Sequence, residues 1–124
     1  MALSISSQVS PIASKLIVQT SSTATADNDV LNAGGTIFML DVDNTANVAQ
    51  DVYVKLYNHA GPTVGTTAPD LVFLVKQGVR RQLGLPEGVL FATAISLATV
   101  TAGGTAGTTS PGSSVIVRIL ASTI

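Results

Sequence analysis

The sequence predicts an all-β protein, an antiparallel β-sandwich or jelly-roll-like fold of roughly seven or eight short strands. Three observations lead to this prediction. Short runs rich in β-branched and aromatic residues recur at fairly regular spacing along the 124 residues. Turns rich in Gly and Pro separate these runs, and no segment shows a convincing helical period. Closely spaced short strands with such turns are typical of sandwiches and small barrels.

The clearest strand spans residues 52–58, with the sequence VYVKLYN. In an extended chain, Val and Leu at positions 52, 54 and 56 face one side, while Tyr, Lys and Tyr face the other. This alternation suits a half-buried sheet surface. Gly61 and Pro62 follow as a turn signal. The remaining segments are best explained as strands that pack around this one.

The other expected strands span residues 15–20, 36–43, 71–76, 79–83, 89–100 and 113–121, and a short strand near 29–31 would bring the number to eight. The segments 36–43 and 71–76 are apolar on both faces, which indicates either a central strand or a face covered by a partner. Residues 89–100 fit a helix on propensity, but their recurring β-branched residues favour a strand. Pro86-Glu87-Gly88 is expected to form the turn before that strand.

Residues 14–124 are predicted to form a single β-sandwich domain, because this length suffices to bury a core. Residues 1–13 are small and polar, with Pro11 as a breaker, and are predicted to form an N-terminal arm. Such an arm either is disordered or lies against a neighbouring subunit.

Two loops resemble each other. Residues 65–69 have the sequence GTTAP and residues 107–111 have GTTSP, and each loop precedes a predicted strand. A threonine lies two residues upstream of each, at Thr63 and Thr105. The similarity predicts that one type of corner is used twice at one end of the sandwich, unless it arises by chance in a chain rich in Gly and Thr.

The composition is poor in charge. Charged residues make up 10% of the chain, against roughly 25% in an average globular domain. The surface is therefore either rich in hydroxyl and amide groups or covered by other subunits. We favour coverage by other subunits, because a low charge density promotes association.

Several classes of function are disfavoured. The formal net charge of −1 gives no electrostatic footprint for nucleic acid. The apolar runs are too short to cross a membrane. The chain has no Cys, so disulfides and thiolate zinc sites are excluded. No basic segment followed by an apolar one marks a secretion signal, so we expect the protein to be made in the cytoplasm.

No segment predicts an enzyme, a cofactor or a metal site. Asp41-Val42-Asp43-Asn44 resembles the start of a calcium loop, but the sixth and twelfth positions hold Ala46 and Val52 instead of Gly and Glu. Aspartates that cap a turn are the better interpretation. His59 is the single histidine, and no nucleophile motif accompanies it. We therefore predict no catalytic residue.

Four residues are candidate interface residues. Arg80 and Arg81 form the main basic cluster and are suited to bidentate pairing with carboxylates of a partner. The alternative is a solvated strand end of little energetic value. Tyr53 and Tyr57 share one face of their strand, and tyrosine is enriched at interfaces. The alternative for both tyrosines is packing over the edge of the sheet.

Three segments, VYVKLYN at 52–58, PTVGTTAPDL at 62–71 and GVLFATA at 88–94, resemble a group of short structural proteins of tailed bacteriophages, including phages of cyanobacteria. The resemblance covers roughly residues 35–120 and is most specific over 52–71. The basic stretch VRRQ at 79–82 departs from the apolar and small residues expected between these motifs. The resemblance implies a virion component with a β-sandwich body, most plausibly a capsid decoration or cement protein.

The function expected from this resemblance is structural. A cement protein would form a homotrimer on the capsid surface of the virion and would stabilise the head by bridging subunits of the major capsid protein. The low-charge, hydroxyl-rich composition points independently to a role based on contact surface. The alternative function is that of a tail, neck or baseplate component, or of a host-surface binding domain.

Overall fold

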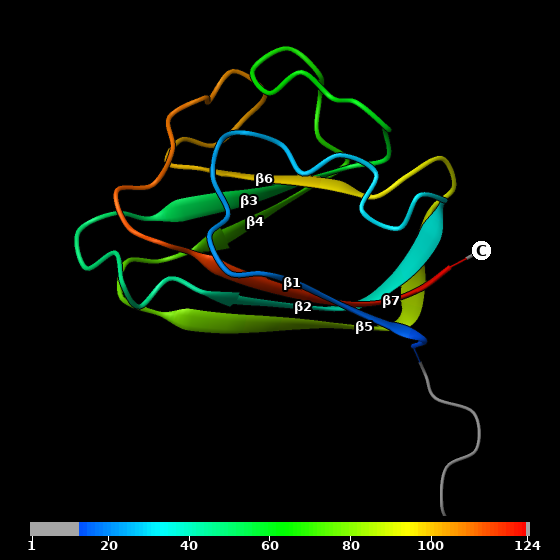
Figure 1. The fold of residues 1–124 in the computed structure, drawn as a ribbon. Coiled ribbons are helices and arrows are strands. Elements are labelled where there is room, and N and C mark those ends of the chain that lie inside the picture. The colour runs from blue at the N-terminus through cyan, green and yellow to red at the C-terminus, as the bar shows by residue number, and fades with distance from the viewer. Residues whose placement is uncertain (1–12, 124) are drawn as a thin grey trace, which may run out of the picture.

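The structure is a computed structural model that describes residues 13–123, and seven strands form within this range (Figure 1). The predicted arm, residues 1–13, therefore lies outside the described residues except for Ala13. The strands are β1 (Lys15–Gln19), β2 (Gly35–Asp43), β3 (Val52–Tyr57), β4 (Leu71–Val75), β5 (Arg80–Phe91), β6 (Ser96–Val100) and β7 (Ile116–Thr123).

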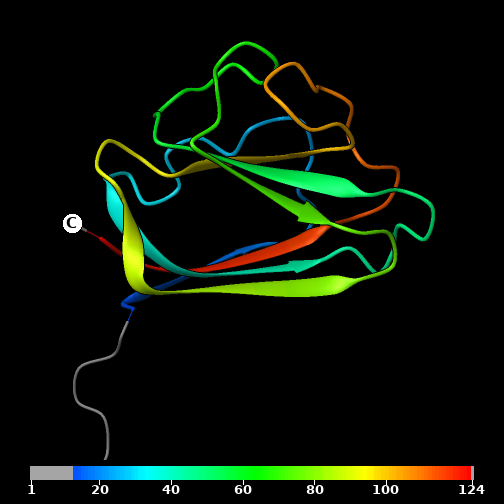
Figure 2. The ribbon, with the colours of Figure 1, turned by 180° about the vertical axis from the view of Figure 1, so that it is seen from behind.

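The strands form two antiparallel sheets that face each other, which confirms the predicted all-β sandwich (Figures 1 and 2). The larger sheet has four strands in the order β1-β7-β2-β5, and the smaller sheet has three in the order β4-β3-β6. The core lies between them and is built by alternate residues of each strand, as period-two patterning requires. From β3, the core receives Val52, Val54 and Leu56, the face expected from the sequence.

Two expectations about strand boundaries are wrong. The segment 79–83 and the start of the segment 89–100 belong to one long strand, β5, and residues 92–95 turn the chain into β6. The side chain of Asn58 fixes this turn, because its Oδ1 accepts hydrogen bonds from the backbone N–H groups of Thr93 (2.8 Å) and Ala94 (3.3 Å). The expected short strand near 29–31 does not form. Instead, Asp27 makes an isolated bridge with Leu97.

The expected turn at Pro86-Glu87-Gly88 lies inside β5 as an irregularity. Ile37 of β2 pairs with Val89 and Met39 pairs with Gly84, so residues 85–88 lie opposite Phe38 alone. Proline is tolerated here because β5 is an edge strand. Gly88 has φ +76° and lies against Thr36 and Phe38, where a Cβ would come within 2.9 Å of Phe38 Cε1 and closer still to Thr36 Cγ2. No other residue would fit there without displacing these two side chains.

Loops of the chain cover the outer face of the smaller sheet, as the green and orange segments above β3 and β6 in Figure 1 show. The two similar loops meet there, because a Cβ on Gly65 would lie 2.5 Å from Thr108 Cγ2. They share a location but differ in hydrogen bonding. The Thr63 carbonyl accepts bonds from Thr66 and Thr67, whereas Thr109 accepts one from Thr101. A further loop, residues 22–31, bonds to the backbone of β6 and closes that edge of the sheet.

Candidate interface on the four-stranded sheet

The outer face of the larger sheet carries a row of apolar residues. Leu16, Leu120, Met39 and Gly84 lie directly opposite one another across β1, β7, β2 and β5. Ile17, Ile119 and Leu40 point toward the core. Because side chains alternate along a strand, Leu16, Leu120 and Met39 point away from the core. Leu16 is 59% exposed. The row therefore crosses the whole sheet on its outer face.

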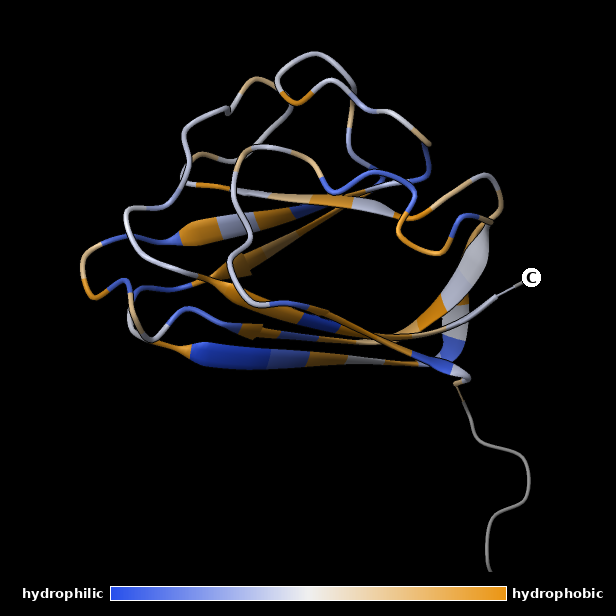
Figure 3. Ribbon diagram, viewed as in Figure 1, coloured by the Kyte–Doolittle hydropathy of each residue, from blue (hydrophilic) through white to orange (hydrophobic). Residues whose placement is uncertain are grey.

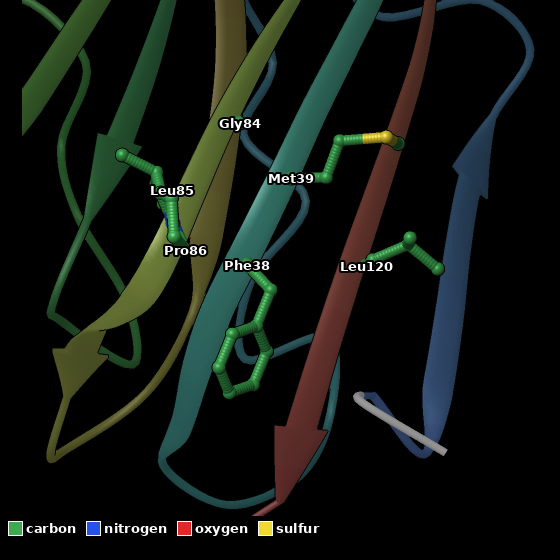
Figure 4. Close-up of a pocket in the computed structure, with 6 residues that line it drawn as sticks. All are labelled: Phe38, Met39, Gly84, Leu85, Pro86 and Leu120. Atoms are coloured by element: carbon green, nitrogen blue, oxygen red, sulfur yellow. The ribbon is translucent and has the colours of Figure 1, made fainter. Parts of the chain in front are cut away.

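A β-bulge widens this row into a band. Ile37 pairs with Ala121 and Met39 pairs with Leu120, so Phe38 is an extra residue in β2. Consequently, Phe38 and Met39 both reach the outer face, and with Pro86 and Leu120 they line a shallow depression of about 340 Å³ (Figure 4). We call Leu16, Phe38, Met39, Pro86 and Leu120 the apolar band.

A polar row lies beside the apolar band. Val18, Arg118, Asp41 and Gln82 are opposite one another across the same four strands, so this row is polar on β7, β2 and β5 and apolar only at Val18 of β1. Figure 3 shows this change as hydrophilic colour at the beginning of β5. The outer face of this sheet is thus divided into an apolar half and a polar half.

Asp41 and Arg80 form the central ion pair of the polar half. Arg80 Nε lies 3.0 Å from Asp41 Oδ1, and Arg80 Nη2 lies 2.6 Å from Asp41 Oδ2. The bond from Arg80 lowers the pKa of Asp41, and bonding to Gln82 and the charge of Arg118 act in the same direction. Arg118 also places Nη1 in a buried position without a hydrogen-bond partner among the described residues. The charges of this half are thus paired within the chain, while Nη1 of Arg118 lacks a hydrogen-bond partner among the described residues.

The structure gives partners within the chain to both arginines predicted as interface residues. Arg80 pairs with Asp41 as described, and its side chain remains half exposed. Arg81 donates a hydrogen bond to the Leu74 carbonyl at 2.8 Å, and its guanidinium lies 4.7 Å from the centre of the Phe73 ring. Arg81 thus links β5 to β4 across the open side of the sandwich. Arg80 belongs to the outer face that carries the apolar band, and Arg81 does not.

The two tyrosines predicted as interface residues lie on the other sheet, beneath the covering loops. Tyr53 is partly buried, and its ring lies against Gly103. Tyr57 is 0% exposed, and its hydroxyl has no hydrogen-bond partner among the described residues. Burial raises the pKa of Tyr57. Tyr57 cannot reach a partner in this conformation, because loops of its own chain occupy the space that the partner would need.

Lys55, between the two tyrosines, is also 0% exposed. Its ammonium group donates hydrogen bonds to the carbonyl oxygens of Gly107 at 2.9 Å and Thr105 at 3.3 Å. Burial lowers the pKa of Lys55. The lysine therefore holds the loop at 101–112 onto the sheet through carbonyl dipoles.

The residues considered for metal or catalytic chemistry have local structural roles. Asp43 Oδ1 accepts bonds from the N–H and the hydroxyl of Thr45, which confirms the expected turn cap for Asp43 and lowers its pKa. The same expectation is wrong for Asp41, which lies inside β2 and pairs with Arg80. His59 is exposed in a turn, and its Nδ1 accepts the N–H of Gly61. Within residues 13–123, no three His, Cys, Asp or Glu side chains come together as metal ligands. No helix in the described range is long and apolar enough to cross a membrane.

The apolar band was not identified residue by residue from the sequence. The signal that could have revealed it is the apolar character of both faces of 36–43, which allowed a face covered by a partner. The bulge at Phe38 is a property of strand pairing and has no signature in a single sequence.

Comparison with known proteins does not place this chain in a family: no family model, curated protein or solved structure matches it.

Proposed function

We propose that this protein is a non-enzymatic structural component of a virion, a capsid cement protein whose outer four-stranded sheet is its surface for contact with other subunits of the shell, copies of this chain included. The observation that supports this proposal best is the apolar band, which crosses an entire sheet face and is not covered by any described part of the chain. Contiguous exposed apolar surface is typical of a protein–protein contact. The low charge content agrees with a surface that becomes covered on assembly.

The polar half of the same face also suits burial. Its main anion, Asp41, is only 3% exposed and is already neutralised by Arg80. A partner that covers this pair would not bury an isolated charge, which would be costly. Arg118 Nη1, which lacks a hydrogen-bond partner among the described residues, would donate to a carboxylate or carbonyl oxygen of the partner.

In the proposed role, a homotrimer binds the outer surface of the head and bridges neighbouring subunits of the major capsid protein. An interface of standard size buries roughly 1,600 Å² in total. Opening the shell would then require the loss of these contacts as well as of the capsid's own. Because each trimer would offer three equivalent surfaces, modest contacts would add through avidity.

The proposal can be tested with heads that lack this protein. We expect purified protein to sediment with such heads and Leu120→Asp to abolish sedimentation, because the aspartate places an unpaired charge in the apolar band. Ala46→Asp is the matched control, since Ala46 is exposed in a turn away from that face, and it should bind normally. Near-native circular dichroism of both variants would show that folding is intact.

Two results would overturn the proposal. One is wild-type protein that never sediments with heads. The other is immunogold label confined to the tail of intact virions, which would favour the tail, neck or baseplate alternative.

A further inference from the structure

We infer that the N-terminal segment, residues 1–12, of a neighbouring copy of this chain covers the apolar band. This inference rests on the proposed function in one respect, that copies of the chain assemble together. The segment lies outside the described residues, so the argument depends on its sequence, on the place where it joins β1, and on the surface that lacks a cover.

The sequence of the segment matches the surface. Leu3, Ile5 and Val9 lie at offsets of two and four positions, and the intervening positions hold Ser and Gln. In an extended chain, the three aliphatic side chains therefore share one face. Residues 1–12 contain no Asp, Glu, Lys or Arg. A solvated tail is ordinarily rich in charge, whereas this segment has the pattern of a strand with one apolar face.

The start of β1 determines the direction of the segment. The N–H of Ser14 donates a hydrogen bond to Ser122 Oγ at 3.1 Å, and Lys15 pairs with Ala121. The chain therefore runs extended beside the end of β7 and points off the end of the sheet. Pro11 restricts the preceding residue to an extended conformation. Residues 1–13 contain no Gly, Asn or Asp, the residues that supply the left-handed conformations of tight hairpin turns. The segment is thus directed away from its own band and toward a neighbour.

The reach of the segment is sufficient. Twelve extended residues span about 40 Å, whereas a sheet of four strands is about 15 Å wide. The segment can therefore leave one subunit and cross the whole apolar band of the next. On the side away from the polar row, the band is bordered by Thr36 and Ser122. Hydroxyl groups at this border can pair with the serines of the segment, and no charge need be desolvated.

Cysteine cross-linking tests the inference directly, because the chain has no native Cys. We would mix an Ile5→Cys chain with a Leu120→Cys chain that carries a size tag, and oxidise the mixture under mild conditions. The inference predicts a disulfide-linked heterodimer. Ser6→Cys mixed with Leu120→Cys should cross-link much less, since residue 6 faces the opposite way. Ile5→Cys mixed with Ala46→Cys should not cross-link, since Ala46 lies away from the apolar band.

A second pair protects the test against misfolding. If Leu120→Cys does not fold, Leu16→Cys occupies the same row at a more exposed position and should give the same heterodimer. In addition, Ile5→Ser should weaken self-association by about tenfold in sedimentation equilibrium, the value expected for losing most of one buried aliphatic side chain. Ser6→Ala is the matched control and should leave self-association unchanged.

Two outcomes overturn the inference. Absence of any cross-link to Leu120→Cys and Leu16→Cys shows that the band is not the docking site. Cross-linking only within a single chain carrying both Ile5→Cys and Leu120→Cys, independent of dilution, shows that the segment covers its own band. The experiment contains no heads, so its failure leaves head binding untouched, and failure of head binding leaves the cross-linking result intact.

Discussion

The outer faces of the two sheets differ in how they are covered. On the three-stranded sheet, loops of the same chain lie over β3, and Lys55 and Tyr57 are completely buried. On the four-stranded sheet, no described segment lies over the outer face, and the apolar band is open (Figures 1 and 4). The chain thus uses its long loops to complete one sheet and leaves the other sheet available for contacts.

The charged side chains on the two faces also have different partners. Asp41, on the open face, is neutralised by a bidentate arginine. Lys55, on the covered face, has only carbonyl oxygens as partners. A partner can cover the ion pair on the open face without burying an unpaired charge. By contrast, burial of the Lys55 ammonium group beneath the loops costs free energy. The two faces should therefore respond differently to mutation and should depend on pH in different pH ranges.

The largest expected difference comes from truncating one outer-face side chain on each sheet. Tyr57→Ala should lower the free energy of unfolding by about 3–5 kcal/mol, the range for large buried side chains. Leu120→Ala should lower it by less than about 1 kcal/mol, because Leu120 faces outward. Urea denaturation of both variants, at a protein concentration low enough to keep the chain monomeric, measures the contrast. Equal losses would show that the outer face of the larger sheet is not free in the monomer.

A smaller effect is expected from the ion pair on the open face. The lowered pKa of Asp41 means that its contribution to stability is present above about pH 4 and is lost as pH falls through the folded-state pKa. Asp41→Asn should therefore destabilise the protein at pH 7, and its difference from wild type should shrink below pH 4. The loss should be smaller than that of Tyr57→Ala, because Arg80 is half exposed.

Denaturation curves between pH 2.5 and 7 would measure this convergence. Glu87→Gln is a suitable control, since Glu87 is an exposed carboxyl group on β5. A destabilisation by Asp41→Asn that stays constant down to the lowest pH would contradict the assignment to the ion pair.

The buried lysine should affect stability at alkaline pH, whereas the ion pair acts at acid pH. The pKa of Lys55 is lowered in the folded state, so the folded protein is penalised while the amine is charged, and stability should rise with pH toward about 10. Lys55→Met should remove this rise. Tyr57, whose pKa is raised, acts against stability once unfolded tyrosines ionise near pH 10, so the curves should stop at about pH 9.5.

Only part of this rise in stability can be measured below pH 9.5. The change in the free energy of unfolding should therefore be smaller than the one that the Asp41 ion pair causes at acid pH. A wild-type stability that is flat between pH 7 and 9.5, or a variant with the same slope as wild type, would show that water reaches the Lys55 ammonium group.

The sequence predicts the fold class and the strand that anchors the smaller sheet. The alternation in VYVKLYN correctly placed Val52, Val54 and Leu56 in the core. It did not predict that the opposite face would be buried as well, because the covering loops come from residues far along the chain. A period-two pattern reports which residues share a face, and distant loops decide how much of that face remains exposed.

The candidate site was less predictable for the same reason. Sequence patterns identified Arg80 and Arg81 by their charge but could not show that Asp41, 39 residues earlier in the chain, neutralises Arg80. They singled out Tyr53 and Tyr57 as aromatic residues, which on this fold lie beneath loops. The apolar band depends on the register of four strands and on one bulge, and neither is encoded locally.

The smallest expected effect is at Arg81, where the two sheets meet along their open side. Arg81→Ala removes the hydrogen bond to the Leu74 carbonyl and the contact with the Phe73 ring. It should lower the free energy of unfolding by about 0.5–1 kcal/mol, as expected for an exposed cation–π contact. Lys76→Ala is the control, because its ion pair with Asp51 is open to water and should contribute less. Thermal denaturation resolves the two variants, and a loss at Lys76 that equals the loss at Arg81 would mean that Arg81 acts only through its charge. A larger loss at Arg81 with unchanged head binding would show that this arginine joins the sheets and leaves contact with partners to the open face.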